Sequence, residues 1–298
     1  MRRRGRPLRR LVAALMLSLG TLACAHAAPI EVRDALGRSV VLPAAPQRLV
    51  TIFASNTELV ASLGLADRIV GIEDFTRFPP EVLSRPKVGG RLGFSVDAVV
   101  AQRPDLVIVT PARQAAHQLV APMERIGVPV LVLLSRSVGE VLDNIRLVAR
   151  ATGVAERGDV LAASLQRRLD AVAHHVAGRP APRVVMVTGR VGNGMLLVAR
   201  DDTYTGEAML KAGGRFALTG RGAVPQVSPE AVLASDPDVL LFAGTRAALD
   251  ELIRQPGWRD MRAVRAGRAI TVSRSEFLIP GPRTIDGIES LAHILHPQ

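Results

Sequence analysis

The segment SVDAVVAQRPDLVIV at residues 95–109 recurs as SPEAVLASDPDVLLF at residues 228–242. Each copy has a serine, an acidic residue two positions later and a Pro-Asp pair before an apolar run, at the same spacing. Two similar halves predict two similar lobes with a cleft between them. Because ligands of open α/β sheets bind outside the carboxyl ends of the strands, we expect a ligand in that cleft.

Short apolar runs rich in β-branched residues alternate with helical patterns along the chain. Strands that alternate with helices are typical of parallel sheets covered on both faces, so an α/β fold is expected. The predicted strands lie within residues 49–53, 69–72, 106–110, 129–134, 184–189, 196–199, 239–244 and 269–273.

The longest helical pattern, at residues 154–177, separates the first four strands from the last four. Leu161, Leu165, Leu169, Val172 and Val176 recur at steps of three and four, as on one face of a helix. We therefore predict an N-terminal α/β lobe at residues 28–152, a bridging helix at 153–180 and a C-terminal α/β lobe at 181–298.

The first 27 residues have the features of a cleaved secretory signal. Six of the 38 basic residues lie in the first ten positions, and the apolar run at 11–23 that follows is too short to span a bilayer. Ala25-His26-Ala27 matches a small-x-small cleavage site. We therefore expect a signal peptide at residues 1–27 and a periplasmic location; a retained membrane anchor is the alternative.

Cys24 is the only cysteine and lies inside the predicted signal. A mature chain without cysteine fits an exported protein that is large enough to need no disulfides. Lipidation of Cys24 is the alternative, but the preceding Thr21-Leu22-Ala23 suits a lipobox poorly. A periplasmic protein is therefore favoured over a lipoprotein.

Charge and composition exclude several classes of function. The formal charge is +11 for the whole chain but only +5 beyond residue 27, so nucleic acid is not an expected partner. Aromatic residues make up 3 % of the chain, with one Trp and one Tyr, so a site walled by many rings is hard to build. No Gly-x-Ser-x-Gly elbow occurs, and no catalytic residue is assigned.

Glycines at positions 189, 192 and 194 follow a predicted strand, but their spacing is not the dinucleotide fingerprint. Strand character resumes at Met195, so we predict a hairpin-like turn. We expect no enzyme; the alternative, a secreted Rossmann-like enzyme, would need a convergent acid–base pair in the cleft.

The strongest candidate for a side-chain metal site is Glu289 with His293 and His296. The three lie on one helical face, but Pro297 and the end of the sequence follow at once. Charge compensation at a helix C-terminus is therefore favoured, and neither a metal site nor a resident cofactor is expected.

Asp97 and Glu230 occupy the matched acidic positions of the repeat. Each follows a serine that is expected to cap a helix, so compensation of the helix dipole explains why an acid is tolerated there. It does not explain why both halves have one. A carboxylate on each lobe is suited to two symmetry-related basic pockets of a dimeric partner.

Arginine is frequent in the predicted loops, whereas the chain has only two lysines. Arginine binds carboxylates and phosphates in a bidentate manner, so several arginines in a cleft suit an anionic ligand; solvated surface residues are the simpler alternative. Ser55-Asn56-Thr57-Glu58 is predicted to be a capping box, in which Ser55 caps the next helix and Glu58 bonds back to the free amide.

Several short motifs follow one another between residues 48 and 297. They are Asn56-Thr57-Glu58-Leu59, Leu63-Gly64-Leu65, Phe78-Pro79-Pro80, Lys87-Val88-Gly89-Gly90, Pro104-Asp105-Leu106, Pro225-Gln226-Val227-Ser228 and Gly281-Pro282-Arg283. In this order they resemble the helix-linked (class III) periplasmic substrate-binding proteins of ABC importers for cobalamin, ferric siderophores and haem. A solute-sensing accessory protein of a signalling receptor would bind its ligand similarly but have no permease.

The resemblance implies two Rossmann-like α/β lobes bridged by one long, rigid α-helix, with a small-molecule ligand in the cleft. It also implies a monomer that docks on a permease dimer of the inner membrane, which works with an ATPase. An acid on each lobe engages arginine pockets of the permease, and the matching positions are Asp97 and Glu230. Asp97 departs from the usual Glu of the family.

The cargo implied by the resemblance is a chelate that contains cobalt or iron. The ring-stacking positions of cobalamin binders match Phe75, Arg91 and Val224, so two of the three rings are missing. The tyrosine ligand of haem binders matches Gly90. Arginine-rich loops suit an anionic ferric siderophore, whereas the Asn-Thr-Glu-Leu and Pro-Gln-Val-Ser segments are closest to the cobalamin binders. Both ligands stay open, with haem as an alternative.

The residues expected to contact the ligand follow predicted strands or belong to the motifs above. They are Phe53, Asn56, Phe75, Arg91, Arg190, Tyr204 and Arg283.

Overall fold

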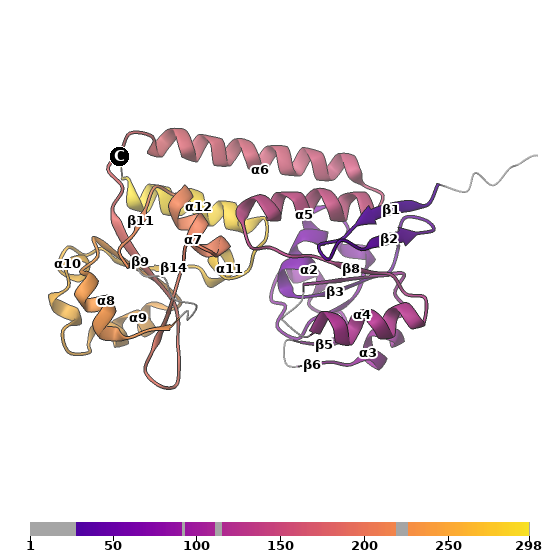
Figure 1. Ribbon diagram of the computed structural model, residues 1–298, viewed down its shortest axis with the longest axis horizontal. Helices are drawn as coiled ribbons and strands as arrows, with labels where there is room; N and C mark the ends of the chain where they lie inside the picture. Colours follow the sequence, from indigo (N-terminus) through magenta and orange to yellow (C-terminus); the bar gives the residue numbers. More distant parts are fainter. Residues whose placement is uncertain (1–27, 91–92, 111–114, 219–225, 298) are drawn as a thin grey trace, which may run out of the picture.

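The computed structural model describes residues 28–90, 93–110, 115–218 and 226–297. These residues form two α/β lobes that lie side by side beneath one long helix (Figure 1). The predicted signal peptide and Cys24 lie outside the described residues. Within the described ranges, no helix combines the length and apolar character that a membrane crossing requires.

The N-terminal lobe is built on a four-stranded parallel sheet in the order β4-β3-β7-β8. Its strands are β3 (Leu49–Ile52), β4 (Ile69–Ile72), β7 (Leu106–Val109) and β8 (Val130–Val132). Its helices are α2 (Ala54–Ser62), α3 (Val96–Ala101), α4 (Ala115–Arg125) and α5 (Val138–Ala151), with 3₁₀ turns at Ala66–Arg68 and Pro80–Val82. Two antiparallel pairs, β1 (Ile30–Arg33) with β2 (Ser39–Leu42) and β5 (Gly89–Gly90) with β6 (Gly93–Phe94), complete the lobe.

The C-terminal lobe has a mixed sheet in the order β12-β10-β9-β13-β14, and β11 also pairs with β9. Its strands are β9 (Arg183–Arg190), β10 (Leu196–Val198), β11 (Arg215–Phe216), β12 (Gln226–Val227), β13 (Val239–Ala243) and β14 (Ala269–Val272). Its helices are α7 (Tyr204–Lys211), α8 (Pro229–Ser235), α9 (Arg246–Ile253), α10 (Arg262–Arg265), α11 (Arg274–Phe277) and α12 (Arg283–Leu295), with a 3₁₀ turn at Trp258–Asp260.

Helix α6 (Ala155–Val176) runs along the top of both lobes in Figure 1 and packs on α5 of one lobe and on α12 of the other. Its apolar face is the predicted one, because Leu165, Leu169 and Val172 are buried. Burial of one apolar stripe, rather than helix propensity, stabilises such a helix. Since α6 contacts both lobes, it fixes how they lie relative to each other.

The predicted α/β fold is confirmed, and all eight predicted strands are present. The predicted hairpin-like turn is also confirmed, because β10 returns antiparallel to β9. The capping box is wrong: α2 begins one residue before Ser55, and Phe53 precedes the helix without a side-chain cap. Ser55 is therefore a helical residue, and Glu58 is free for a different partner.

Candidate functional site: the cleft between the lobes

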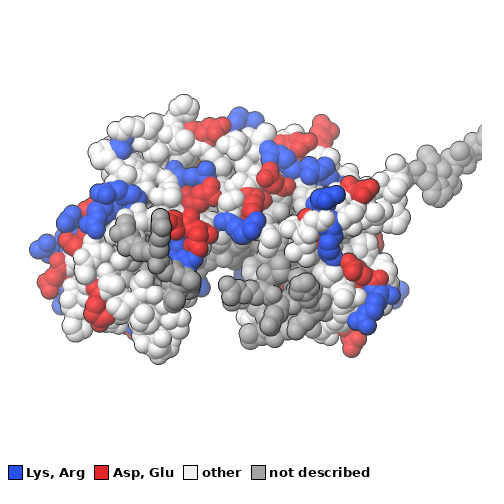
Figure 2. Space-filling view, in the orientation of Figure 1, with Lys and Arg blue, Asp and Glu red and all other residues white. Residues whose placement is uncertain are grey.

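The molecular surface is hollowed between the two lobes, at the lower edge of Figure 2. Segments that follow two strands of the N-terminal sheet contact the other lobe. The loop after β4 and helix α2, which follows β3, both contact the start of α12. The segments after β3 and β4 therefore face the C-terminal lobe, at the strand ends where the open-sheet rule predicts a ligand.

The connection between β3 and α2 is a single residue in a strained conformation. Phe53 has φ 94° and ψ 131°, a region that favours glycine, and it is half-buried. Such a conformation costs about 1–3 kcal/mol and persists only where the surroundings impose it. This tight turn places the first turn of α2 directly at the carboxyl end of β3.

The buried Asn56 side chain forms hydrogen bonds at the ends of two strands. It is 2 % exposed, its Nδ2 donates to the carbonyl of Ile52 at 2.7 Å, and its Oδ1 accepts from Thr110 at 3.1 Å. These bonds join the end of β3 to the residue that follows β7. The ligand contact predicted at Asn56 stays a prediction; in the structure the side chain is a buried link between two strand ends.

Arg283, at the start of α12, is held by two residues of the other lobe. Its Nη2 and Nε donate to Oε2 of Glu58 at 2.6 and 2.8 Å, and its backbone nitrogen donates to Oε1 at 3.1 Å. Its guanidinium also lies 4.0 Å from the centre of the Phe78 ring. The ligand contact predicted at Arg283 stays a prediction; in the structure this guanidinium joins the two lobes.

A second carboxylate bridges the lobes near the top of the cleft. Oε2 of Glu207, on α7, accepts the backbone N–H of Val138 at 2.6 Å, at the start of α5. A carboxylate at a helix N-terminus is favourable because it meets free N–H groups and the positive end of the helix dipole. The two lobes are thus tied by polar contacts at two separate places.

Phe75 lies in the same loop as Phe78 and is 52 % exposed. An exposed ring of this size, in a loop whose other Phe contacts the opposite lobe, offers an apolar surface at the cleft. Among the expected contacts that lie within the described residues, its side chain is the most exposed. Phe53, by contrast, is half-buried in its turn.

The remaining expected contacts differ in their surroundings. Arg190, the last residue of β9, is exposed and pairs with Glu251 of α9 at 3.0 Å. Tyr204 is half-buried, and its hydroxyl is buried without a hydrogen-bond partner among the described residues; burial raises the pKa of this hydroxyl. Arg91 and Val224 lie outside the described residues.

Arg274 was not among the expected contacts, yet it lies at the carboxyl ends of two strands of the C-terminal sheet. Its Nη1 donates to the carbonyls of Thr188 in β9 and Ala243 in β13 at 3.1 and 3.2 Å. The side chain is exposed. Its position after β14, within the predicted strand-end loops, is the signal that would have identified it.

Asp97 and Glu230 are both exposed in the first turn of a short helix, α3 and α8. Each helix has its predicted serine cap: Ser95 accepts from Ala98, and Ser228 accepts from Ala231. Hydrogen bonds from its own backbone amide and from Ser228 hold the pKa of Glu230 below the ordinary value. Glu230 therefore stays ionised to lower pH than a free glutamate.

The three residues of the candidate metal site have separate partners. Glu289 binds Arg168 of α6, His293 lies against the ring of His175, and His296 contacts the carbonyl of Gly213. In the described part of the chain, no three His, Cys, Asp or Glu side chains are grouped as metal ligands would be.

A family model and the relatives found by sequence comparison all describe binding proteins. A family model described as "Periplasmic binding protein" matches residues 49–275. An uncharacterised ABC transporter substrate-binding lipoprotein of Bacillus subtilis is 26 % identical over 90 % of this chain and 86 % of its own length. A cobalamin-binding protein of Halobacterium salinarum is 25 % identical over 90 % of this chain and 74 % of its own.

The fold has well-matched counterparts among solved structures. A periplasmic haem-binding protein from Pseudomonas aeruginosa superposes with a TM-score of 0.75 at 30 % identity, over 85 % of this chain and 94 % of its own. The match covers both lobes and the helix between them.

Proposed function

The chain belongs to the periplasmic binding protein family, and from that premise we propose that it captures a metal chelate for an ABC importer. The observation that carries the proposal is the cleft between two lobes, together with near full-length similarity to ABC and cobalamin-binding relatives. The relatives are binding proteins, and we propose that this chain likewise carries out no reaction. The cargo brings its own cobalt or iron, so no resident cofactor is required.

The proposed cargo is a corrinoid such as cobalamin, or a ferric siderophore. Phe75 supplies an exposed ring at the cleft, and Arg274 and Arg190 supply positive charge near the ends of the C-terminal strands. These groups suit a ligand with both an apolar face and anionic groups. Haem is the second candidate, favoured by the 30 % identity to the Pseudomonas aeruginosa protein.

The proposed partner is a permease dimer in the inner membrane with its ATPase, and the proposed location is the periplasm. Exposed carboxylates on both lobes, Asp97 and Glu230, suit a partner with two symmetry-related basic pockets. The predicted signal peptide and the similarity to exported relatives support the location. A monomer suffices for this arrangement, because one chain presents both acids.

A ligand panel tests the proposal. The exported protein is titrated with cyanocobalamin, haemin and several ferric siderophores, with thermal unfolding and ligand absorbance as readouts. A ligand at 100 times its Kd stabilises the folded protein by about 2.7 kcal/mol, which raises Tm by a few degrees. We expect one chelate class to do so. A Tm that no chelate raises would overturn chelate binding and leave the fold assignment intact.

A further inference from the structure

The two helices that carry Asp97 and Glu230 are too short to be stable by themselves. α3 has six residues and α8 has seven, whereas isolated helices need about 12–15 residues even to be marginal in water. Each has one buried residue, Val99 in α3 and Val232 in α8. Contacts at their ends must therefore fix where the two carboxylates point.

An arginine binds the C-terminal end of each helix. In the N-terminal lobe, Arg48 lies directly before β3 and donates from Nη2 to the carbonyl of Gln102 at 2.7 Å. Its Nε also donates to the carbonyls of Gln102 and Arg103, at 3.2 and 3.0 Å. These carbonyls belong to the end of α3, where the backbone has no intrahelical donors left.

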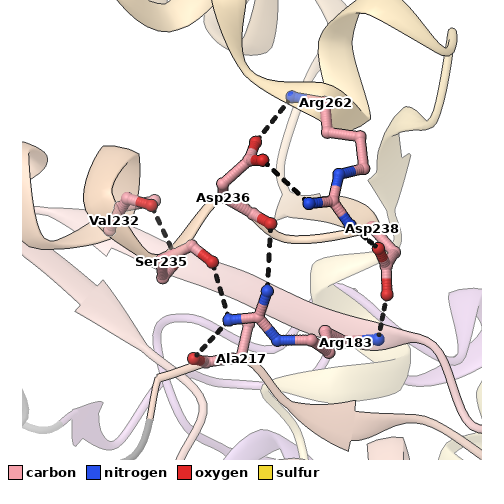
Figure 3. Close-up of polar contacts among 7 residues, drawn as sticks. All are labelled: Arg183, Ala217, Val232, Ser235, Asp236, Asp238 and Arg262. Carbon is pink, nitrogen blue, oxygen red and sulfur yellow. Dashed lines mark hydrogen bonds and ion pairs between the residues drawn. The ribbon is translucent and has the colours of Figure 1, made fainter.

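Arg183 makes the same contacts in the C-terminal lobe, as the first residue of β9. Its Nη2 donates to the carbonyl of Ser235 at 2.7 Å, and its Nη1 donates to the carbonyl of Asp236 at 3.3 Å (Figure 3). Ser235 and Asp236 are the counterparts of Gln102 and Arg103 in the repeat. The two arginines thus bind matched carbonyls, although neither lies in the repeated segment itself.

Two further features of this arrangement are matched between the lobes. Arg103 and Asp236 both have positive φ, 46° and 35°, a conformation that non-glycine residues adopt only when the surroundings impose it. The aspartate of each Pro-Asp pair binds the backbone N–H of the arginine: Asp105 accepts from Arg48 at 2.8 Å, and Asp238 accepts from Arg183 at 2.9 Å. The arginine, the aspartate and the helix end form one closed unit.

The C-terminal unit has further hydrogen bonds at the helix end, so we expect α3 and α8 to respond unequally to loss of their arginines. Arg262 also binds this unit in the C-terminal lobe: its backbone nitrogen donates to Asp236 at 2.7 Å and its Nη1 to Asp238 at 2.8 Å (Figure 3). In the N-terminal lobe Asp105 also accepts the backbone N–H of Gln47 at 2.8 Å, but among the described residues no hydrogen bond to the Arg103 side chain matches those that the Asp236 carboxylate accepts. Helix α3 therefore depends more on Arg48 than α8 does on Arg183.

We propose that Arg48 and Arg183 are matched positioning residues that hold the two acid-bearing helices for docking on a dimeric partner. The inference rests on the proposed function, in which Asp97 and Glu230 contact the permease. On this proposal, neither arginine contacts the partner or the cargo. Each acts through the helix end that it binds, so its removal affects docking and leaves capture of the ligand unchanged.

The first test measures local order. Amide hydrogen exchange is compared between the parent protein, R48Q and R183Q. We expect faster exchange at residues 99–103 in R48Q and at 232–236 in R183Q, with the rest of each lobe unchanged. Exchange that stays at the parent rate in these segments would overturn the proposal, whatever the partner is.

The second test measures the Kd of the protein for its permease–ATPase complex in nanodiscs. We expect R48Q to weaken docking about fivefold and R183Q somewhat less, as for the loss of about one hydrogen bond. R48K and R183K should recover most of the affinity, because an ammonium still donates to these carbonyls. The absorbance-monitored affinity for the chelate should not change.

Matched controls separate positioning from general stability. Arg268 binds the last carbonyls of α12, which has no docking acid, and Arg68 binds the carbonyls of Pro46 and Thr152. R268Q and R68Q should leave docking within about twofold of the parent. Equal losses in controls and test variants would overturn the proposal.

A D97N/E230Q variant distinguishes failure of the inference from failure of the proposed function. If it docks as tightly as the parent, the acids are not docking groups and the docking part of the proposed function fails. If it docks weakly while R48Q and R183Q dock normally, only the positioning role of the arginines fails.

Discussion

Glu58 and Arg283 are 225 positions apart in the chain, yet they join the two lobes through three hydrogen bonds of 2.6–3.1 Å. The Glu58 side chain is 3 % exposed and that of Arg283 is 25 % exposed. Such a pair is a constraint on geometry more than a source of net stability, because desolvation offsets much of the attraction. It fixes the start of α12 against α2.

Removal of either partner should destabilise the protein, but unequally. R283M leaves the buried Glu58 carboxylate unpaired and should cost about 3 kcal/mol, whereas E58Q leaves a partly exposed guanidinium and should cost about 1–2 kcal/mol. Urea denaturation of both variants and of the double variant measures this. The double variant should lose less than the sum. Strict additivity would show that the two groups do not interact in solution.

Replacement of Phe75 should affect ligand binding without affecting stability. Because its ring is 52 % exposed, F75A should change the free energy of unfolding by no more than about 0.5 kcal/mol. Loss of an aromatic contact should raise the Kd of the chelate about three- to tenfold. L36A, which removes an exposed side chain from the turn between β1 and β2, is the control and should leave both quantities unchanged. Normal affinity in F75A would remove this ring from the binding site.

Charge reversal of the two exposed acids should separate uptake from capture. D97R/E230R places a positive charge at both proposed docking points, so transport of the chelate should be abolished. The affinity for the ligand in solution should be unchanged, because neither residue belongs to the contacts between the lobes. Transport assays in cells and titration of the purified variant measure the two quantities. A loss of ligand affinity would contradict the separation.

Local sequence patterns were sufficient for the elements of the fold. The strands and the face of α6 follow from short-range periodicity, because burial on one or both faces dictates which positions are apolar. The repeat also identified the serine caps and the exposed acids at 97 and 230. These features depend on neighbours within a few residues, which the sequence displays directly.

Contacts between distant segments were not predictable in the same way. The spacing of Ser55 and Glu58 matches a capping box, but burial places Glu58 against Arg283, which no local pattern indicates. Asn56 was expected at the ligand, and no local pattern indicates the hydrogen bond that it accepts from Thr110, 54 positions away. In the sequence, no feature distinguishes Arg48 from other arginines that precede a strand. Its role is visible only once its lobe is folded.

The ion pairs between α6 and α12 predict a specific dependence on pH. Arg168 donates from Nε to Glu289 at 2.8 Å and also binds Asp286, and its hydrogen bond holds the pKa of Glu289 below the ordinary value. A lowered pKa means that the carboxylate contributes stability above its unfolded-state pKa and loses it as the pH falls through the folded-state value.

E289Q should therefore be less stable than the parent at pH 7 by about 1 kcal/mol or less. The difference should shrink below about pH 4.5, as the parent carboxylate becomes protonated. Urea denaturation across pH 3–7 gives the curve. D170N, which alters an exposed carboxylate on the same helix whose hydrogen-bond partner is the neutral Gln166, is the control and should show no such trend. A difference that is the same at every pH would contradict the ion-pair explanation.

Gly158 of α6 should be intolerant of even one methyl group. A Cβ at this position would lie 2.3 Å from the Cβ of Ala149 in α5 and 3.2 Å from the carbonyl oxygen of Ile145, so α5 and α6 would have to separate. Alanine is favoured over glycine in a helix by about 1 kcal/mol, but overpacking costs about 1–3 kcal/mol or more. The steric effect should prevail, and G158A should be destabilised.

G139A is the matched control for G158A, because Gly139 lies in helix α5 with its nearest neighbour, Ser137 Oγ, at an ordinary 3.7 Å. This variant gains helix propensity without a clash and should be stabilised by up to about 1 kcal/mol. Urea denaturation of the two variants should thus give shifts of opposite sign. Stabilisation of both would mean that α5 and α6 separate at little cost, so that α6 would not hold the lobes rigidly.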